Sequence, residues 1–256
     1  MGRFDFTYGA YERLLENISE RFRIIGPQNL IKSEIGPWCF LRHDLDNDLE
    51  LALKMATIEH TMGIQSTYYL MIASSLYNCF SPENKQIVSE IIEMGHGIGL
   101  HFCLKSHGKY DSAVLEAIQR ERCFLENIFD VSICTVSFHQ PWQAVNSQET
   151  GVTSLDFSLQ EKLGLINTYS SEDMKQAFYV SDSLMQFRNI GDPVDFFRQT
   201  EERNIQLLIH PSWYDDTWSD VESRWDRLML IRFRRMLSEK MKHERSMNRP
   251  RKVGLL

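Results

Sequence analysis

The stretch Phe40-Leu41-Arg42-His43-Asp44-Leu45-Asp46-Asn47-Asp48 decides the fold that this sequence predicts. It begins as an apolar run that is typical of a buried strand, and it then becomes abruptly polar. A helical stripe of apolar residues follows at once, and Asp48 is placed to cap that helix. The acidic residues therefore lie where a strand ends and a helix begins, which in parallel α/β folds is where ligands bind.

Asp44 and Asp46 alternate along this extended segment, so both side chains are expected on the same side of the strand. Two neighbouring carboxylates repel each other unless a cation lies between them or one of them is protonated. The pair therefore indicates a charged site. A solvated acidic loop that ends in a helix cap is the simpler alternative.

Composition is typical of a globular protein, because 43% of the 256 residues are hydrophobic and 11% are aromatic. No apolar run approaches the length of a membrane span, and residues 1–6 do not resemble a signal peptide. The five cysteines show no Cys-x-x-Cys spacing, which favours reduced thiols. Together these features predict a cytoplasmic protein without a membrane span.

Charge is unevenly distributed along the chain. Residues 224–256 hold eleven basic and three acidic residues, which gives this segment a charge of +8. Because the net charge of the whole chain is −7, residues 1–223 carry −15. A basic tail from about residue 220 can bind nucleic acid or an anionic membrane, or it can be a solvated helix face or cover an acidic surface. Since no nucleic-acid-binding motif accompanies the charge, we expect no nucleic-acid partner.

Strand and helix patterns alternate along the chain. Strands are expected over residues 38–41, 64–72, 96–102, 134–138, 163–167, 179–180 and 205–209, and helices over 7–23, 48–62, 82–94, 111–128, 193–203 and from about 220 to beyond 240. This alternation predicts parallel strands with right-handed helical crossovers. Without repeats or linkers that would divide it, residues 1–256 are expected to form a single α/β barrel-like domain.

Polar residues follow four of the apolar runs at their carboxyl ends: Asp44 with Asp46, then His101, His139 and His210. In a parallel barrel these ends converge on one face. One Asp and two His form a typical ligand set of a catalytic zinc or similar ion, with one position left open. The second Asp could then accept a proton and the remaining His could donate one, which indicates a metal-assisted hydrolase.

Three segments resemble the motifs of the polysaccharide deacetylase superfamily, carbohydrate esterase family 4. They are His43-Asp44-Leu45-Asp46, Gly95-His96-Gly97-Ile98-Gly99-Leu100-His101 and Ile209-His210-Pro211. The resemblance runs from about Tyr8 to Trp218 and is closest to a divergent branch associated with surface-polysaccharide biosynthesis. It implies a distorted (β/α)7 barrel that removes an N-acetyl group from an amino sugar.

The resemblance also implies residue roles. Asp44 matches the general base, Asp46 a metal ligand, His101 the first ligand histidine and His210 the general acid.

One position departs from the family pattern. The second ligand histidine is expected four residues after His101, but Lys105 stands there, and a charged lysine cannot coordinate a metal. His139 lies near the place of the family's Arg-x-Pro segment. We predict His139 as the third ligand, with His107 as the substitute.

Three further residues are candidates for binding the substrate. Trp142 and Trp213 flank the histidines and could stack on a sugar ring, although core packing explains them equally well. Asp182 could form a hydrogen bond to the substrate, or it could cap a loop. His43 is expected on the other side of its strand, in a structural role.

The sequence thus favours a metal-dependent deacetylase of an amino sugar or nucleotide-linked sugar precursor of surface glycan. One divalent ion is expected, and zinc suits the ligands, as nickel, cobalt or iron also do. The alternatives are a hydrolase of a small non-sugar amide and a catalytically degenerate carbohydrate-binding protein. The oligomeric state stays open.

Overall fold

The structure, a computed structural model, describes residues 4–26, 36–106, 111–141, 145, 154–155, 157–217 and 219–246. The chain forms two compact units, Met1–Asp216 and Thr217–Leu256. The first unit contains the whole sheet, and the second contains one long helix.

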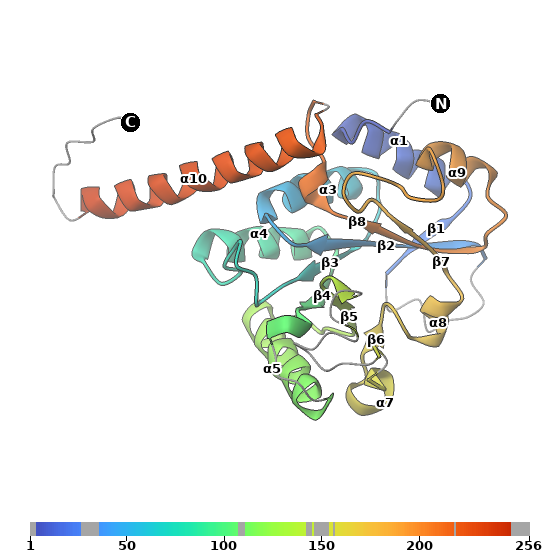
Figure 1. Cartoon of the computed structure of the whole chain (residues 1–256), viewed down its shortest axis with the longest axis horizontal. Helices are drawn as coiled ribbons and strands as arrows, with labels where there is room; N and C mark the ends of the chain where they lie inside the picture. Colours follow the sequence, from blue (N-terminus) through green and yellow to red (C-terminus); the bar gives the residue numbers. More distant parts are fainter. Residues whose placement is uncertain are drawn as a thin grey trace. The chain divides into compact units, whose positions relative to one another are not determined.

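The first unit is built on an eight-stranded sheet in which every pairing is parallel (Figure 1). The strands are β1 (Arg23–Ile25), β2 (Trp38–Leu45), β3 (Thr67–Leu70), β4 (Gly97–Phe102), β5 (Thr135–Phe138), β6 (Ile166–Asn167), β7 (Phe178–Ser181) and β8 (Asn204–Ile209). Their order is β6-β5-β4-β3-β2-β8-β7, and β1 pairs with the beginning of β2. The sequence had not indicated β1, whose three residues are too few for a periodic pattern.

The strand order is that of a barrel opened at one seam. Strand β8 returns beside β2, so the order is cyclic except between β6 and β7, which do not pair within the described residues. Strand β6 has only two residues and cannot support a long ladder. The predicted distorted (β/α)7 barrel is therefore confirmed as a parallel sheet that curls into an incomplete barrel.

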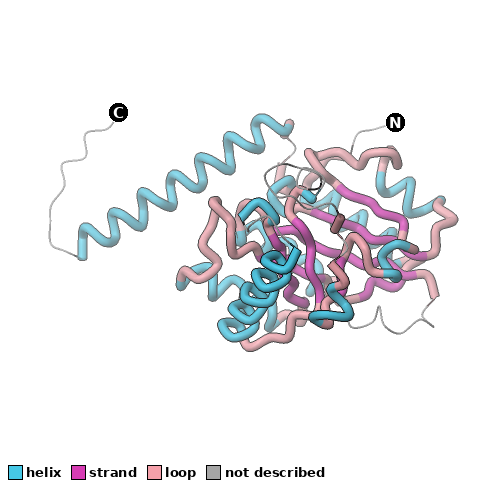
Figure 2. Tube along the Cα trace, turned by 60° about the horizontal axis from the view of Figure 1, so that its bottom comes forward, coloured by secondary structure: helices cyan, strands magenta, loops and turns pink. Residues whose placement is uncertain are grey.

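Helices surround the curled sheet, as Figure 2 shows. They are α1 (Tyr8–Ser19), α3 (Leu49–Thr61), α4 (Pro82–Glu93), α5 (Asp111–Phe129), α7 (Leu159–Leu163), α8 (Glu172–Lys175) and α9 (Pro193–Gln199), with 3₁₀ turns η1 (Leu104–Ser106) and η2 (Pro211–Trp213). The Asp48 carboxylate accepts the backbone N–H groups of Glu50 and Leu51 and so begins α3. Ser81 caps α4 in the same way, ahead of a proline at the first helical position.

Alternating residues of each strand pack on opposite sides of the sheet. On the helix-covered side, apolar side chains of β3, β4 and β5 join those of α3, α4 and α5 in one core. On the inner side, Gly99 of β4 lies against the ring of Tyr69, where a Cβ atom would approach to 2.4 Å. Only glycine fits this contact, which lets Tyr69 fill the barrel beside the strand that carries His101.

The second unit contains α10 (Val221–Ser246), a helix of 26 residues. Exposed apolar side chains recur along it at helical spacing: Met229, Leu230, Phe233, Met236, Leu237 and Met241. Basic residues lie between them, as the sequence predicted for this end of the chain. Among the described helices, none is long and apolar enough to cross a membrane.

Candidate active site

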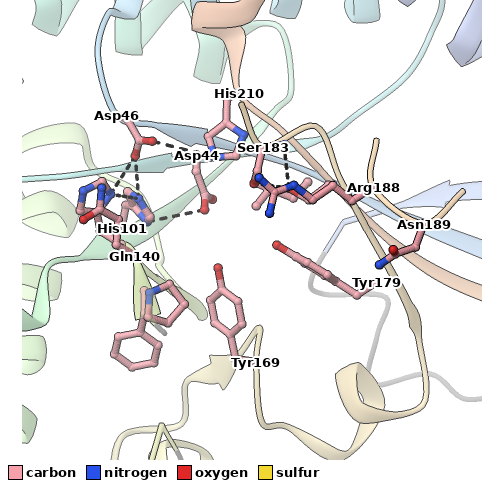
Figure 3. A pocket seen from close by; sticks show the side chains of 15 residues that line it. Asp44, Asp46, His101, Gln140, Tyr169, Tyr179, Ser183, Arg188, Asn189 and His210 are labelled. Atoms are coloured by element: carbon pink, nitrogen blue, oxygen red, sulfur yellow. Dashed lines mark hydrogen bonds and ion pairs between the residues drawn. The ribbon is translucent and has the colours of Figure 1, made fainter. Parts of the chain in front are cut away.

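The predicted strand-end residues meet at one cavity of about 380 Å³ (Figure 3). Asp44 lies in β2 and Asp46 directly after it, while His101 lies in β4. His139 and His210 directly follow β5 and β8. All five residues line the cavity, because each continues the inward-facing alternation of its strand.

Asp46, His101 and His139 form a compact triad. The Asp46 Oδ1 atom lies 3.0 Å from His101 Nε2 and 3.1 Å from His139 Nδ1, and the two nitrogens are 3.3 Å apart. Four ligands held at about 2.0–2.1 Å from a tetrahedral ion lie roughly 3.3 Å from one another. The donor set and its spacing therefore fit a divalent metal site of one carboxylate and two imidazoles.

The neighbours of Asp46 strongly favour its charged form. Burial alone would raise the pKa of Asp46, but hydrogen bonds and charges from His101, His139 and His210 outweigh burial and hold it well below its usual range. His139 is also held firmly, since its backbone N–H donates to Phe102 O at 2.9 Å and extends the pairing of β5 with β4. Rigid strand ends of this kind suit a ligand site.

Asp44 has its own cationic partner, which the sequence analysis missed. The Arg42 Nη1 atom donates to both Asp44 oxygens, at 2.8 and 3.1 Å, and Ser137 Oγ donates to Asp44 Oδ2 at 2.9 Å. Arg42 Nη2 also donates to Tyr169 Oη at 3.0 Å. Asp44 therefore has its own positive partner, separate from the triad around Asp46. The period-two alternation Arg42, Asp44, Asp46 was the signal that placed Arg42 on this side.

His210 is oriented by Asp182. The Asp182 carboxylate lies 2.6 Å from His210 Nδ1 and accepts the His210 backbone N–H at 2.9 Å. His210 Nε2 is thereby directed into the cavity, 3.9 Å from Asp46 Oδ2. Burial alone would lower the pKa of His210, but the charge and hydrogen bond of Asp182 outweigh burial and raise the pKa to about 9.

Two residues predicted to bind substrate lie elsewhere. Asp182 is fully buried beneath His210 and does not line the cavity, so the structure gives it an orienting position instead. Trp213 is 5% exposed in η2 and is also not a cavity residue, which agrees with the core-packing alternative. Trp142 and the substitute ligand His107 lie outside the described residues. Lys105 is exposed in η1.

The remaining cavity wall comes from the later part of the barrel, where the sequence had given no motif. Tyr169 follows β6, Tyr179 belongs to β7, and Ser183, Arg188 and Asn189 belong to the loop between β7 and α9. Single polar residues in irregular segments carry no periodic signal, so only the fold brings them to the site.

Comparisons with known proteins give the fold a context. No family model and no curated protein matches the chain. Among solved structures, a peptidoglycan deacetylase from Bacillus subtilis is 12% identical, with 83% of this chain and 96% of that chain covered and a TM-score of 0.46. A Streptococcus mutans CE4 esterase is 11% identical, with coverages of 91% and 92% and a TM-score of 0.47.

A third similar structure is a CE4 family pseudoenzyme from Bacillus anthracis. It is 10% identical, with a TM-score of 0.46 and coverage of 77% of this chain, which spans only 60% of that chain's length.

Proposed function

We propose that this protein is a metal-dependent hydrolase that removes an N-acetyl group from an amino sugar or an amino-sugar precursor of surface glycan. One observation carries the proposal. A carboxylate–imidazole triad with the spacing of metal ligands lies in the same cavity as a candidate base, Asp44, and a candidate acid, His210.

Asp46, His101 and His139 would hold the ion, and zinc is the metal that best suits this donor set. A divalent ion at this position supplies Lewis-acid polarisation of the acyl carbonyl. Nickel, cobalt or iron would satisfy the same ligands.

Asp44 is suited to accept the proton of the attacking water. Arg42 and Ser137 fix the orientation of its carboxylate, and Asp44 lines the cavity. A general base positioned in this way contributes roughly 100- to 10,000-fold to turnover.

His210 is suited to protonate the leaving nitrogen. Asp182 fixes Nδ1 so that Nε2 points into the cavity, and its charge raises the pKa of His210, which favours the protonated ring that an acid needs. An amine leaves poorly unless it is protonated, so amide cleavage requires such an acid.

The cavity wall suits a hydroxylated substrate. The hydroxyl groups of Tyr169, Tyr179, Ser181 and Ser183 line it, and hydroxyls both donate and accept hydrogen bonds. A volume of about 380 Å³ lies within the usual range for small-molecule sites. These properties favour a sugar over a small apolar amide.

Lys105 supports a second candidate, a carbohydrate-binding protein without activity, because it replaces a histidine that the family motif would supply as a ligand. Metal analysis and acetate release separate the two functions. We expect the purified chain to hold about one divalent ion and to release acetate from N-acetylated sugars faster than from simple amides. Chelation should abolish acetate release, and added metal should restore it. Full metal occupancy with no acetate from any sugar would favour the binding protein.

A further inference from the structure

Arg188 lies across the cavity from Asp46 and His101 (Figure 3). Its side chain is exposed to solvent. Within the part of the chain that the structure describes, no side chain or backbone group forms an ion pair or hydrogen bond with its guanidinium. Arg188 is therefore a cation that lines the site and is free to bind a ligand.

The loop that carries Arg188 is anchored by its neighbour. Phe187 is buried, with its ring 5.3 Å from the ring of Phe4 and stacked at 5.6 Å on that of Phe6. Met185, two residues earlier, is 2% exposed. Because Phe187 and Met185 are buried in the protein, the backbone position from which Arg188 reaches the cavity is held in place.

The same loop has an uncommon backbone. Leu184, Met185 and Asn189 have φ angles of 57°, 53° and 68°, in the left-handed region that residues other than glycine rarely adopt. Such conformations cost free energy and persist where the surrounding structure imposes them. The loop is therefore held in one specific shape around Arg188.

The cavity leaves no carboxylate for Arg188. Asp44 is neutralised by Arg42, Asp182 is buried under His210, and Asp46 faces two histidines and the position of a divalent cation. An arginine without a partner beside a metal site attracts negative charge. Nearby hydroxyls of Tyr179 and Ser183 and the amide of Asn189 can donate further hydrogen bonds to anionic oxygens.

We propose that Arg188 binds an anionic oxygen group, a carboxylate or a phosphate, on the part of the substrate distant from the N-acetyl group. It thereby selects charged amino sugars over neutral ones. This inference rests on the proposed deacetylase function and specifies its substrate class.

The test uses the metal-loaded full chain and three probes: N-acetylglucosamine, which is neutral, N-acetylglucosamine 1-phosphate and N-acetylmuramic acid, which carries a carboxylate. Calorimetry gives each Kd, and acetate release gives each kcat/KM. Hydrogen bonds to charged groups contribute about 1.5–3 kcal/mol, so Arg188→Gln should weaken binding of an anionic probe roughly 10- to 100-fold. Affinity for the neutral sugar should not change, and Arg188→Lys should restore part of the loss.

Arg120→Gln is the matched control, because Arg120 is an exposed arginine of α5 that pairs with Glu116 and is not a cavity residue. It should leave all three affinities unchanged. Which anionic probe is preferred distinguishes phosphate from carboxylate.

Equal losses for neutral and anionic probes, or failure of both anionic probes to bind better than the neutral sugar, would overturn the role of Arg188. Arg188-dependent binding of an anionic probe without acetate release would support the anion site while refuting the deacetylase. Deacetylation of the anionic probes that does not change in Arg188→Gln would support the deacetylase function and refute the anion site.

Discussion

The two sides of strand β2 carry two charged clusters, of which one lines the cavity and the other is enclosed by protein. Arg42 and Asp44 point to the inner side, toward the cavity, whereas His43 between them points to the outer side. There it meets Glu59 of α3, and His43 and Glu59 are both fully buried. One strand thus supports a cluster that faces a cavity and another that is enclosed.

Around Glu59 every carboxylate oxygen has its own donors. Oε1 lies 2.6 Å from His43 Nε2 and accepts the hydroxyl of Tyr11, and Oε2 accepts the hydroxyls of Ser66 and Tyr68. Burial alone would raise the pKa of Glu59, but His43 and the other partners outweigh burial and lower it. Both oxygens of Glu59 are thus occupied, and Glu59 and His43 are enclosed by protein, so we interpret this cluster as structural.

On the inner side, polar atoms are left facing open space. The side chains of Asp46 and His139 are each 23% exposed, and His210 Nε2 points into the cavity. Burial of charged residues alone therefore does not tell whether a cluster has a functional or a structural role. The distinction is whether the charged groups line an open cavity or are enclosed by protein.

Loss of a triad member should have the largest effect on turnover. Asp46→Ala removes the carboxylate that faces both histidines, so metal content and acetate release should fall together, to background. Metal analysis of the purified variant beside an activity assay checks this. Wild-type metal occupancy in Asp46→Ala would remove Asp46 from the ligand set.

Asp44→Asn should have the next largest effect. The amide keeps the shape of the side chain but cannot accept the proton of water, so turnover should fall roughly 100-fold or more while metal content stays at the wild-type level. Steady-state kinetics with metal analysis measures both. Loss of the metal in Asp44→Asn would mean that Asp44 helps to bind the metal and is not only a base.

His210→Ala should have an effect that depends on the substrate. Because an amine needs protonation to leave and an activated ester of the same acyl group does not, amide hydrolysis should slow more than ester hydrolysis. The measurement is the fold-loss of kcat/KM in the variant for the amide, divided by the fold-loss for the ester. Equal losses would leave His210 in an orienting role only.

The strand-end residues could be predicted because their signal is local. An apolar run followed by a histidine places His101, His139 and His210 at the carboxyl ends of strands, and a parallel fold brings such ends together. The contact of Asp182 with His210 could not be predicted, because His210 lies 28 residues away, at the end of the neighbouring strand.

Arg42 and Arg188 could not be assigned from the sequence, for different physical reasons. Arg42 pairs with Asp44 on its own strand, but it also contacts Tyr169, which follows β6, and Ser137 on β5, which is separated from β2 by β3 and β4. Only the curvature of the sheet brings Arg42 and Ser137 together. Arg188 depends on an irregular loop whose shape is imposed by packing of Phe187.

Glu59→Gln should have the smallest effect on turnover and a large effect on stability. The uncharged amide has only one acceptor oxygen and cannot accept all four donors, so the free energy of unfolding at pH 7 should fall by roughly 3–5 kcal/mol, as when one member of a buried charged network is removed. Metal content and turnover per folded molecule should stay unchanged. Glu116→Gln is the matched control, because Glu116 is exposed on α5 and its pair with Arg120 contributes at most about 0.5 kcal/mol.

The pH dependence sharpens this last prediction. Because the folded-state pKa of Glu59 is lowered, its contribution is fully present above the ordinary value, about 4.3, and is lost as the pH falls through the folded-state pKa. The difference in unfolding free energy between wild type and Glu59→Gln should therefore be constant from pH 7 to about pH 5 and shrink below it. Urea unfolding at several pH values measures the difference. A difference that grows on acidification would contradict the lowered pKa of Glu59. Lost turnover at full stability would mean that the enclosed cluster acts in catalysis and that enclosure does not separate the two sides of β2.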